Sequence, residues 1–308
     1  MIEELIEQGS YEAALDLLSK EDSDIAKYQR VICYSGLRDY PKVVELASKL
    51  IKEPNNRHYY DVLSLYIVAL IKINQQEEAM KLLEAELKMP FIPGQFEDFF
   101  ETTYRQLKLQ KEKGNINRSP YDLYTDEQLQ NILLTTSKLN ELAPVVQQLG
   151  HRNIRNFLAA LEVVLMNKDV AGYLKSIIIE LLRDQNVSQE FEYADYETEI
   201  RITPTELLPV DETEAYQAIM KGVSEQIAPD NVSLSNVAKD VALLVLVGTY
   251  PFDIEKVEYD YYIAAIECVA TKMFGMPLDL DLILEKYEVE APKLDEYVKK
   301  VTKLNDIY

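Results

Sequence analysis

The sequence predicts a mainly α-helical protein, and three observations lead to that prediction. Glycine supplies only 9 of the 308 residues, whereas it makes up about 7% of an average protein, so few positions favour the left-handed backbone of tight turns. Apolar residues recur at helical spacing along most of the chain, and only one short segment alternates with a period of two. With 47% apolar residues, the chain is long enough for two domains, each with its own core.

Three segments near the start of the chain repeat one pattern, a polar turn followed by a helix with an early apolar pair. The turns begin at Gly9, Arg38 and Asn74. The apolar pairs are Ala14-Leu15, Val43-Val44 and Ala79-Met80, and Pro54 and Pro90 close the second and third segments. The intervals between the pairs are 29 and 36 residues, and the prolines are also 36 residues apart. This near-constant spacing favours internal repetition over three unrelated amphipathic helices.

These segments resemble the tetratricopeptide repeat (TPR) family, whose unit of about 34 residues is a helix, a turn and a second helix. The resemblance covers residues 1–93 and is most complete at Gly9, Tyr11 and Ala14. At such positions a small side chain lets two helices approach, and the tyrosine fills the gap at the turn. The sequence departs from the family pattern at Lys27 and Arg30, which stand where apolar residues are expected. The resemblance implies a TPR-like α-solenoid over residues 1–110.

The period is lost from residue 93 onward. Residues 95–109 are predicted to form one more helix, either the first half of a fourth repeat or a terminal cap. Residues 111–120 are polar and contain Gly114 and Pro120, and a linker is predicted over residues 111–124.

Residues 125–308 are predicted to form an acidic α-helical domain with a short β-hairpin. Thr125 is the expected N-cap of its first helix. Helices over 125–186 resemble HEAT-like stacking, a hairpin is expected over 188–204, and further helices over 211–307. The hairpin is predicted because residues 190–193 and 199–202 alternate polar with apolar across a five-residue gap.

The order of these parts also resembles a family of bacterial TPR-containing proteins of unassigned function. The segments that carry this likeness are residues 202–209 and 270–275. The likeness concerns the whole chain and implies no activity.

The charge balance argues against nucleic acid as a partner. The chain has 32 Lys and Arg against 53 Asp and Glu, a net charge of −21, and such a field repels polyphosphates. Residues 187–308 alone hold 10 basic and 25 acidic side chains. This acidity is interpreted either as a solvated surface that keeps the protein soluble or as a face for a basic partner.

Cysteine use and hydropathy predict a cytoplasmic protein without a membrane span. Cys33 and Cys268 lie far apart inside apolar helical segments, as buried thiols in a reducing compartment do. The first residues carry neither a basic region nor a long apolar run, unlike a secretory signal. The longest apolar runs, 65–71 and 241–247, are far shorter than the roughly 20 residues that a membrane helix needs.

No catalytic, cofactor-binding or metal-binding residues are predicted. The two histidines, His58 and His151, have no ligand-type spacing to each other or to a cysteine. The glycine-rich loops that cradle phosphates are missing. We therefore expect a protein that is not an enzyme and needs no cofactor.

The TPR resemblance implies that the first helices of successive repeats line a groove for an extended peptide or a helix of another protein. The expected groove residues are Tyr28, Gln29, Ile32, Ser35, Asp61, Ser64, Leu65, Val68 and Lys72. This set lacks the regular Lys and Arg residues that would grip a C-terminal carboxylate. The predicted function is a protein-protein interaction module, an adaptor or scaffold.

Two alternatives remain open at this point. The first is an RNA- or ribosome-associated factor that uses the basic stretch of Arg105, Lys108, Lys111, Lys113 and Arg118. The second is an enzyme with an unrecognised site in the C-terminal domain, for example at the hairpin.

Overall fold

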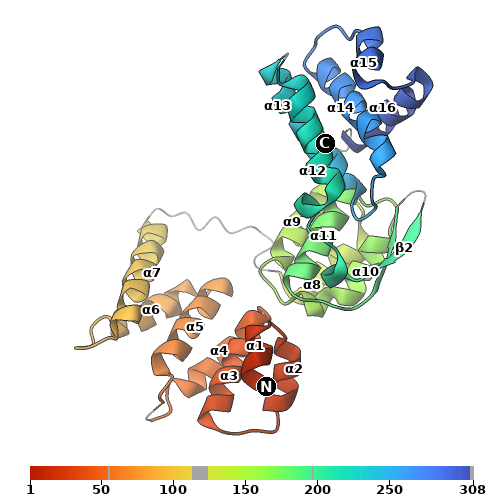
Figure 1. The fold of residues 1–308 in the computed structure, drawn as a ribbon. Coiled ribbons are helices and arrows are strands. Elements are labelled where there is room, and N and C mark those ends of the chain that lie inside the picture. The colour runs from red at the N-terminus through yellow and green to blue at the C-terminus, as the bar shows by residue number, and fades with distance from the viewer. Residues whose placement is uncertain (55, 113–123, 196–197, 230, 306–308) are drawn as a thin grey trace. The chain divides into compact units, whose positions relative to one another are not determined.

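The computed structural model describes residues 1–308 except 55, 113–123, 196–197, 230 and 306–308 (Figure 1). The described residues form 16 α-helices and one two-stranded sheet, which confirms the mainly α prediction. They group into two compact units, residues 1–130 with 147–157, and residues 131–146 with 158–308.

The first unit begins with seven helices. These are α1 (Ile2–Glu7), α2 (Tyr11–Leu18), α3 (Asp24–Gly36), α4 (Tyr40–Leu50), α5 (Tyr59–Lys72), α6 (Gln76–Glu86) and α7 (Gly94–Glu112). Each helix packs against the next, and in addition α3 packs against α5 and α5 against α7. This arrangement is that of stacked helical hairpins, so the predicted α-solenoid is present. Helix α7 packs against α6 and α5 in the same way as α5 packs against α4 and α3. It therefore occupies the position of the first helix of a fourth hairpin.

The turns of the three hairpins have the same backbone geometry. Gly9, Arg38 and Asn74 follow α1, α3 and α5, and all have left-handed backbones with φ of 74°, 57° and 62°. In each turn the amide of this residue donates a hydrogen bond to the carbonyl three residues before it, over 3.0–3.1 Å. The next amide donates to the carbonyl five residues before it, over 2.7–2.9 Å. These paired bonds define a Schellman motif. The repetition predicted from the sequence is therefore also present in the backbone conformation of the three turns.

The second helices of the hairpins pack through their small early residues. Ala14, Val43 and Ala79 are each fully buried, as the sequence pattern predicts. The Tyr11 ring lies against Gly36 at the end of α3, where an added Cβ would overlap the ring. The tyrosine therefore fills space against the following hairpin, and a glycine in that hairpin makes the room.

Two further stretches belong to the first unit. Asp126 begins α8 (Asp126–Thr135), and Thr125 caps it as predicted: the Gln128 amide donates to Thr125 Oγ1 over 3.3 Å. Residues 147–157 contain the end of α9 (Leu139–Leu149) and the 3₁₀ turn η2 (Ile154–Phe157). The Arg155 Nε lies 2.8 Å from Glu12 Oε1, which ties this stretch to α2. The grouping differs from the predicted domains, which assign both stretches to the C-terminal domain. Most of the predicted linker lies outside the described residues.

The second unit contains the remaining elements. They are α10 (Leu158–Met166), α11 (Gly172–Asp184), β1 (Phe191–Ala194), β2 (Glu199–Ile202), the short turns η3 (Pro204–Glu206), η4 (Val210–Glu212) and η5 (Lys256–Glu258), α12 (Glu214–Ile227), α13 (Val232–Thr249), α14 (Tyr259–Met273), α15 (Leu280–Tyr287) and α16 (Ala291–Asn305). The strands pair antiparallel with Phe191 opposite Ile202, which confirms the predicted hairpin. Strand β1 packs against α10, and α11 packs against α13.

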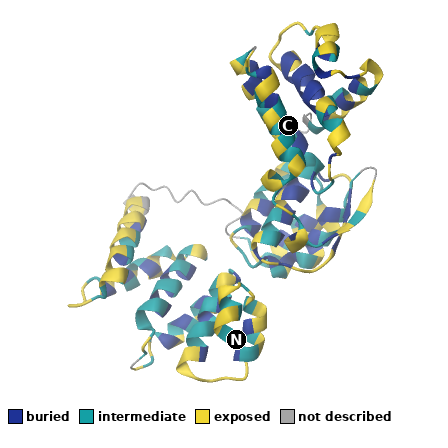
Figure 2. Cartoon of the chain, in the orientation of Figure 1, coloured by how far each residue is buried: buried dark blue, intermediate teal, exposed yellow. Residues whose placement is uncertain are grey.

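The C-terminal core forms around α14, in which every residue from Tyr262 to Thr271 is buried (Figure 2). Helices α12, α13 and α16 pack against it, and α15 adds a shorter contact. Among the described helices, α13 alone has the length and apolarity of a membrane span. Its buried residues, such as Ala238, Val241 and Val245, recur every three to four positions and face this core. Helix α13 is therefore packed as the core helix of a bundle.

One charged side chain is enclosed beneath the hairpin. Lys175 on α11 is 1% exposed. Its Nζ donates a hydrogen bond to the Ala194 carbonyl over 2.6 Å and lies 5.2 Å from the centre of the Tyr193 ring. Burial lowers the pKa of Lys175 from 10.5 to about 8, because removing an ammonium from water favours its neutral form.

Replacing Gly36 by alanine tests the packing of Tyr11. We expect G36A to lower the free energy of unfolding by about 1–3 kcal/mol, since the new methyl group meets the ring. Gly94 at the start of α7 is the matched control, because an added Cβ there meets nothing within 4 Å. G94A should raise the free energy of unfolding by less than about 1 kcal/mol. Urea denaturation followed by circular dichroism compares them, and equal losses would contradict this packing.

The buried Lys175 predicts a pH dependence of stability. Between pH 8 and 10.5 the unfolded chain keeps the proton that the folded protein has lost, so this residue makes the free energy of unfolding rise with pH. Measured against K175M, the wild type should gain about 2 kcal/mol between pH 8 and 9.5. Titrating tyrosines and cysteines act equally in both proteins and cancel in the difference. Parallel pH profiles of the two proteins in urea denaturation would contradict the assignment.

Candidate functional site

The nine predicted groove residues lie on two neighbouring helices that pack against each other, α3 and α5. Tyr28, Gln29, Ile32 and Ser35 are on α3, and Asp61, Ser64, Leu65, Val68 and Lys72 are on α5. None of the nine is buried: Lys72 is exposed and the other eight are half-buried. Residues between them, such as Val31 and Ile67, are fully buried in the core of the hairpins. We call these nine residues the α3–α5 face.

An aromatic stack stands at one end of this face. The Tyr28 and His58 rings are parallel to within 10°, with centroids 4.2 Å apart. His58 Nδ1 lies 3.9 Å from Asp61 Oδ2. Burial, and then the Asp61 charge, raise the pKa of Tyr28, so its hydroxyl stays protonated at neutral pH. This contact was not predicted from the sequence, because the two rings come from different hairpins.

The rest of the face combines apolar and polar groups. Ile32, Leu65 and Val68 present apolar surface. Ser64 Oγ donates to the Tyr60 carbonyl within its own helix, over 2.8 Å. Asp61 and Lys72 give the face one charge of each sign. Such a mixture fits a protein segment better than a polyphosphate.

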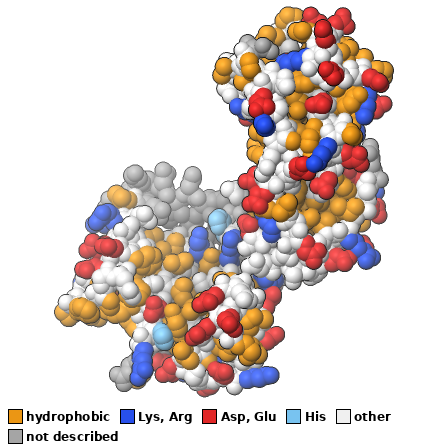
Figure 3. Space-filling model, viewed as in Figure 1, with side chains coloured by type: hydrophobic (Ala, Val, Ile, Leu, Met, Phe, Trp, Pro, Cys, Tyr) orange, Lys and Arg blue, Asp and Glu red, His pale blue; other side chains and the backbone are white. Residues whose placement is uncertain are grey.

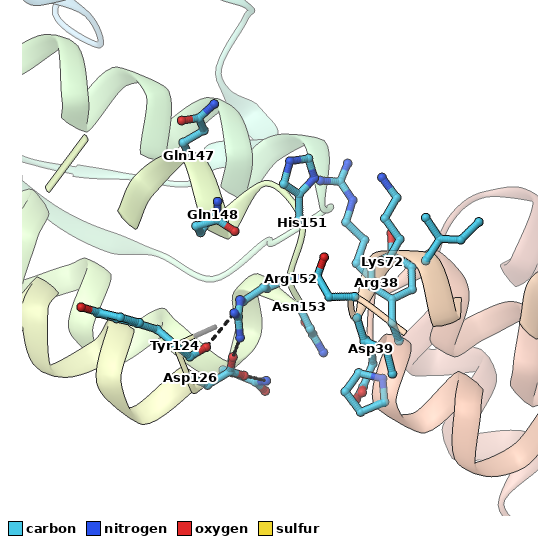
Figure 4. Close-up of a pocket in the computed structure, with 16 residues that line it drawn as sticks. Arg38, Asp39, Lys72, Tyr124, Asp126, Gln147, Gln148, His151, Arg152 and Asn153 are labelled. Carbon is cyan, nitrogen blue, oxygen red and sulfur yellow. Dashed lines mark hydrogen bonds and ion pairs between the residues drawn. The ribbon is translucent and has the colours of Figure 1, made fainter. Parts of the chain in front are cut away.

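A pocket of about 610 Å³ lies in the first unit, at the turns of the second and third hairpins (Figure 4). Residues from three stretches of the unit line it: Arg38, Asp39, Tyr40 and Pro41; Ile71, Lys72, Ile73 and Asn74; and Tyr124, Asp126, Gln147, Gln148, His151, Arg152, Asn153 and Asn156. Of these, only Lys72 was predicted as a site residue. The alignment of Arg38 with Gly9 is the sequence signal that could have marked the pocket, since arginine is unusual in a left-handed turn position.

Hydrogen bonds fix two of the pocket's basic side chains. Arg152 Nη1 lies 2.6 Å from Asp126 Oδ1, and Arg152 Nη2 donates to the Tyr124 carbonyl over 2.8 Å. Asn156 Nδ2 donates to the other Asp126 oxygen over 2.8 Å. Arg38 Nη1 donates to the Gly150 carbonyl. The pocket is thus lined by three Lys and Arg side chains and two carboxylates. This local excess of positive charge contrasts with the net charge of −21 of the whole chain.

The second carboxylate, Asp39, is engaged in the fold. Its Oδ1 accepts a hydrogen bond from the Lys42 amide at the start of α4, over 3.3 Å. Burial raises the pKa of Asp39 above its usual value. This group therefore acts as a helix cap and is a poor counter-ion for the pocket's cations.

Reactive and metal-binding groups are scarce in the described parts of the chain. No group of three His, Cys, Asp or Glu side chains could hold a metal ion among the residues described. Cys33 and Cys268 are buried free thiols, as predicted. Burial raises the pKa of each thiol to about 11, which keeps both protonated and unreactive at neutral pH.

The predicted basic stretch is only partly described. Arg105, Lys108 and Lys111 are exposed on α7, and Lys111 Nζ lies 3.8 Å from Glu77 Oε1. Lys113 and Arg118 lie outside the described residues. Glu97, Asp98 and Glu101 share the helix, so its described part carries no net positive charge.

Comparison with known proteins adds one relative. No family model matches the chain. The chain is 23% identical, over 311 aligned positions, to the TPR repeat-containing protein YsoA of Bacillus subtilis strain 168, and the match covers 98% of this chain and 90% of the relative. The chain is similar to a TPR protein over almost its whole length. This confirms the resemblance inferred from the sequence. The relative's name does not place its repeats, so their assignment to residues 1–93 stays a prediction.

Proposed function

We propose that the protein is a non-enzymatic interaction module, a TPR-type adaptor or scaffold of the cytoplasm. The α3–α5 face would hold an extended peptide or a helix of a partner protein. The observation that carries the proposal is that two successive first helices pack side by side and leave all nine face residues accessible. The similarity to a TPR protein supports the same function, and the buried free thiols suit a reducing compartment.

The chemistry of the face suits a protein segment. Tyr28 is held in place by its stack on His58, so little side-chain freedom is lost when a partner covers it. Ile32, Leu65 and Val68 supply half-buried apolar surface that gains free energy when water is removed from it. The polar groups between them can pair with a partner's backbone.

A basic partner for the acidic C-terminal region forms a second part of the proposal. Residues 187–308 carry 10 basic and 25 acidic side chains. On the face drawn in Figure 3, acidic side chains are spread over the second unit among basic and apolar ones. Such a surface would speed the approach of a basic protein over a wide area.

The α3–α5 face is tested by affinity capture from cell extract followed by mass spectrometry. We expect a partner that binds the wild type to be lost or strongly reduced with Y28A, L65A and S35R. S35R blocks the face without removing an apolar contact. The control is L134A, which truncates an exposed leucine on α8 and should retain the partner.

Thermal melts followed by circular dichroism must show that each variant is folded at the capture temperature. Partners that bind the wild type and the three face variants alike, or no partner above background with the wild type, would contradict the proposal.

A further inference from the structure

The pocket at the hairpin turns contains an arginine in a conformation that costs energy. Arg38 has φ of 57°, a region that side chains other than glycine, asparagine and aspartate rarely adopt. The equivalent positions of the other two hairpins hold Gly9 and Asn74. A residue held in such an unfavourable backbone conformation often has a functional role, so the contacts of the Arg38 guanidinium are of interest.

Two side chains of the pocket carry positive charge without a nearby carboxylate partner. Arg38 uses one of its five N–H donors on the Gly150 carbonyl. Lys72, at the end of α5, is exposed and has no ion pair or hydrogen bond within the described chain. Arg38, Lys72 and His151 are among the residues that line the pocket, and Figure 4 labels all three. Cations gathered in this way repel one another unless an anion lies between them.

The pocket's carboxylates do not supply that anion. Asp126 pairs with Arg152, and Asp39 caps α4. The charges that remain uncompensated are those of Arg38 and Lys72. An arginine and a lysine together match a phosphate group, since the arginine offers a planar pair of donors and the lysine a compact charge.

We propose that this pocket binds a small phosphorylated molecule, with its phosphate held by Arg38 and Lys72. The volume of about 610 Å³ falls within the roughly 300–1,000 Å³ of small-molecule sites and far exceeds that of a phosphate ion. The amides of Gln147, Asn153 and Asn156 and the ring of Tyr40 line the remaining space. They suit a ligand with a polar body. This site goes beyond the proposed partner-binding face, with which it shares only Lys72.

The direct test is isothermal titration calorimetry with inorganic phosphate and with AMP, at an ionic strength held constant with chloride. We expect saturable binding of both, tighter for AMP, and none of adenosine, which lacks the phosphate. Failure of both anions to bind, or binding of adenosine as tight as that of AMP, would overturn the proposal.

Two variants assign the phosphate contact. R38G places glycine where the first hairpin already has it, so the turn is retained while the guanidinium is lost. K72Q removes the lysine charge at an exposed helix end. Each should weaken AMP binding by about tenfold or more, as loss of a charge-assisted hydrogen bond does. Because K72Q disturbs no packed group, it tests the site even if R38G is less stable.

Controls separate the site from a general charge effect and from the proposed function. K81Q removes another exposed lysine of the first unit, on α6, and should leave AMP binding unchanged, as should Y28A on the α3–α5 face. Equal weakening by K81Q and K72Q would show a non-specific charge effect and overturn the site. Loss of the protein partner in Y28A with AMP binding intact would show that the two sites act independently.

Discussion

The first unit depends on one backbone constraint, a left-handed residue that follows the first helix of each hairpin. Gly9, Arg38 and Asn74 all adopt this conformation, and the same two hydrogen bonds close each turn. The bonds set the direction in which the second helix leaves, so the hairpins have a common shape and can stack. Glycine and asparagine adopt this conformation readily, so Arg38 is the residue that hydrogen bonding and helix packing hold against its intrinsic preference.

This constraint produces two different surfaces from one repeat. The first helices α3 and α5 pack side by side and present a mixed apolar and polar face. The turns of the second and third hairpins supply part of a pocket. In that pocket Arg152 pairs with Asp126, and the positive charges of Arg38 and Lys72 have no carboxylate partner among the residues described. Lys72 lies at the end of α5 and therefore belongs to both. The core needs only the small and apolar positions, and the turn fixes the backbone conformation, so the side chain at the turn differs from one hairpin to the next.

Periodicity was enough to predict most of the fold. The helices, the capping Thr125 and the hairpin strands follow from local patterns. Contacts between distant residues could not be foreseen. The stack of Tyr28 on His58, the fit of Tyr11 against Gly36 and the enclosure of Lys175 each join residues from separate elements. The pocket was missed for the same reason, since its residues come from three separate stretches whose meeting no local pattern records.

Helix α13 carries a consequence for the newly made chain. Its apolar stripe packs against α12, which precedes it in the chain, and against α14 and α16, which follow it. Helix α16 spans Ala291–Asn305. Because α16 ends 56 residues after Thr249 (305 − 249), that cover is complete only after several seconds of further synthesis at ~5–20 residues per second. Throughout this interval a helix with the length and apolarity of a membrane span lacks part of its cover. The order in which the bundle's elements are synthesised therefore leaves this helix without its full cover until α16 has been made.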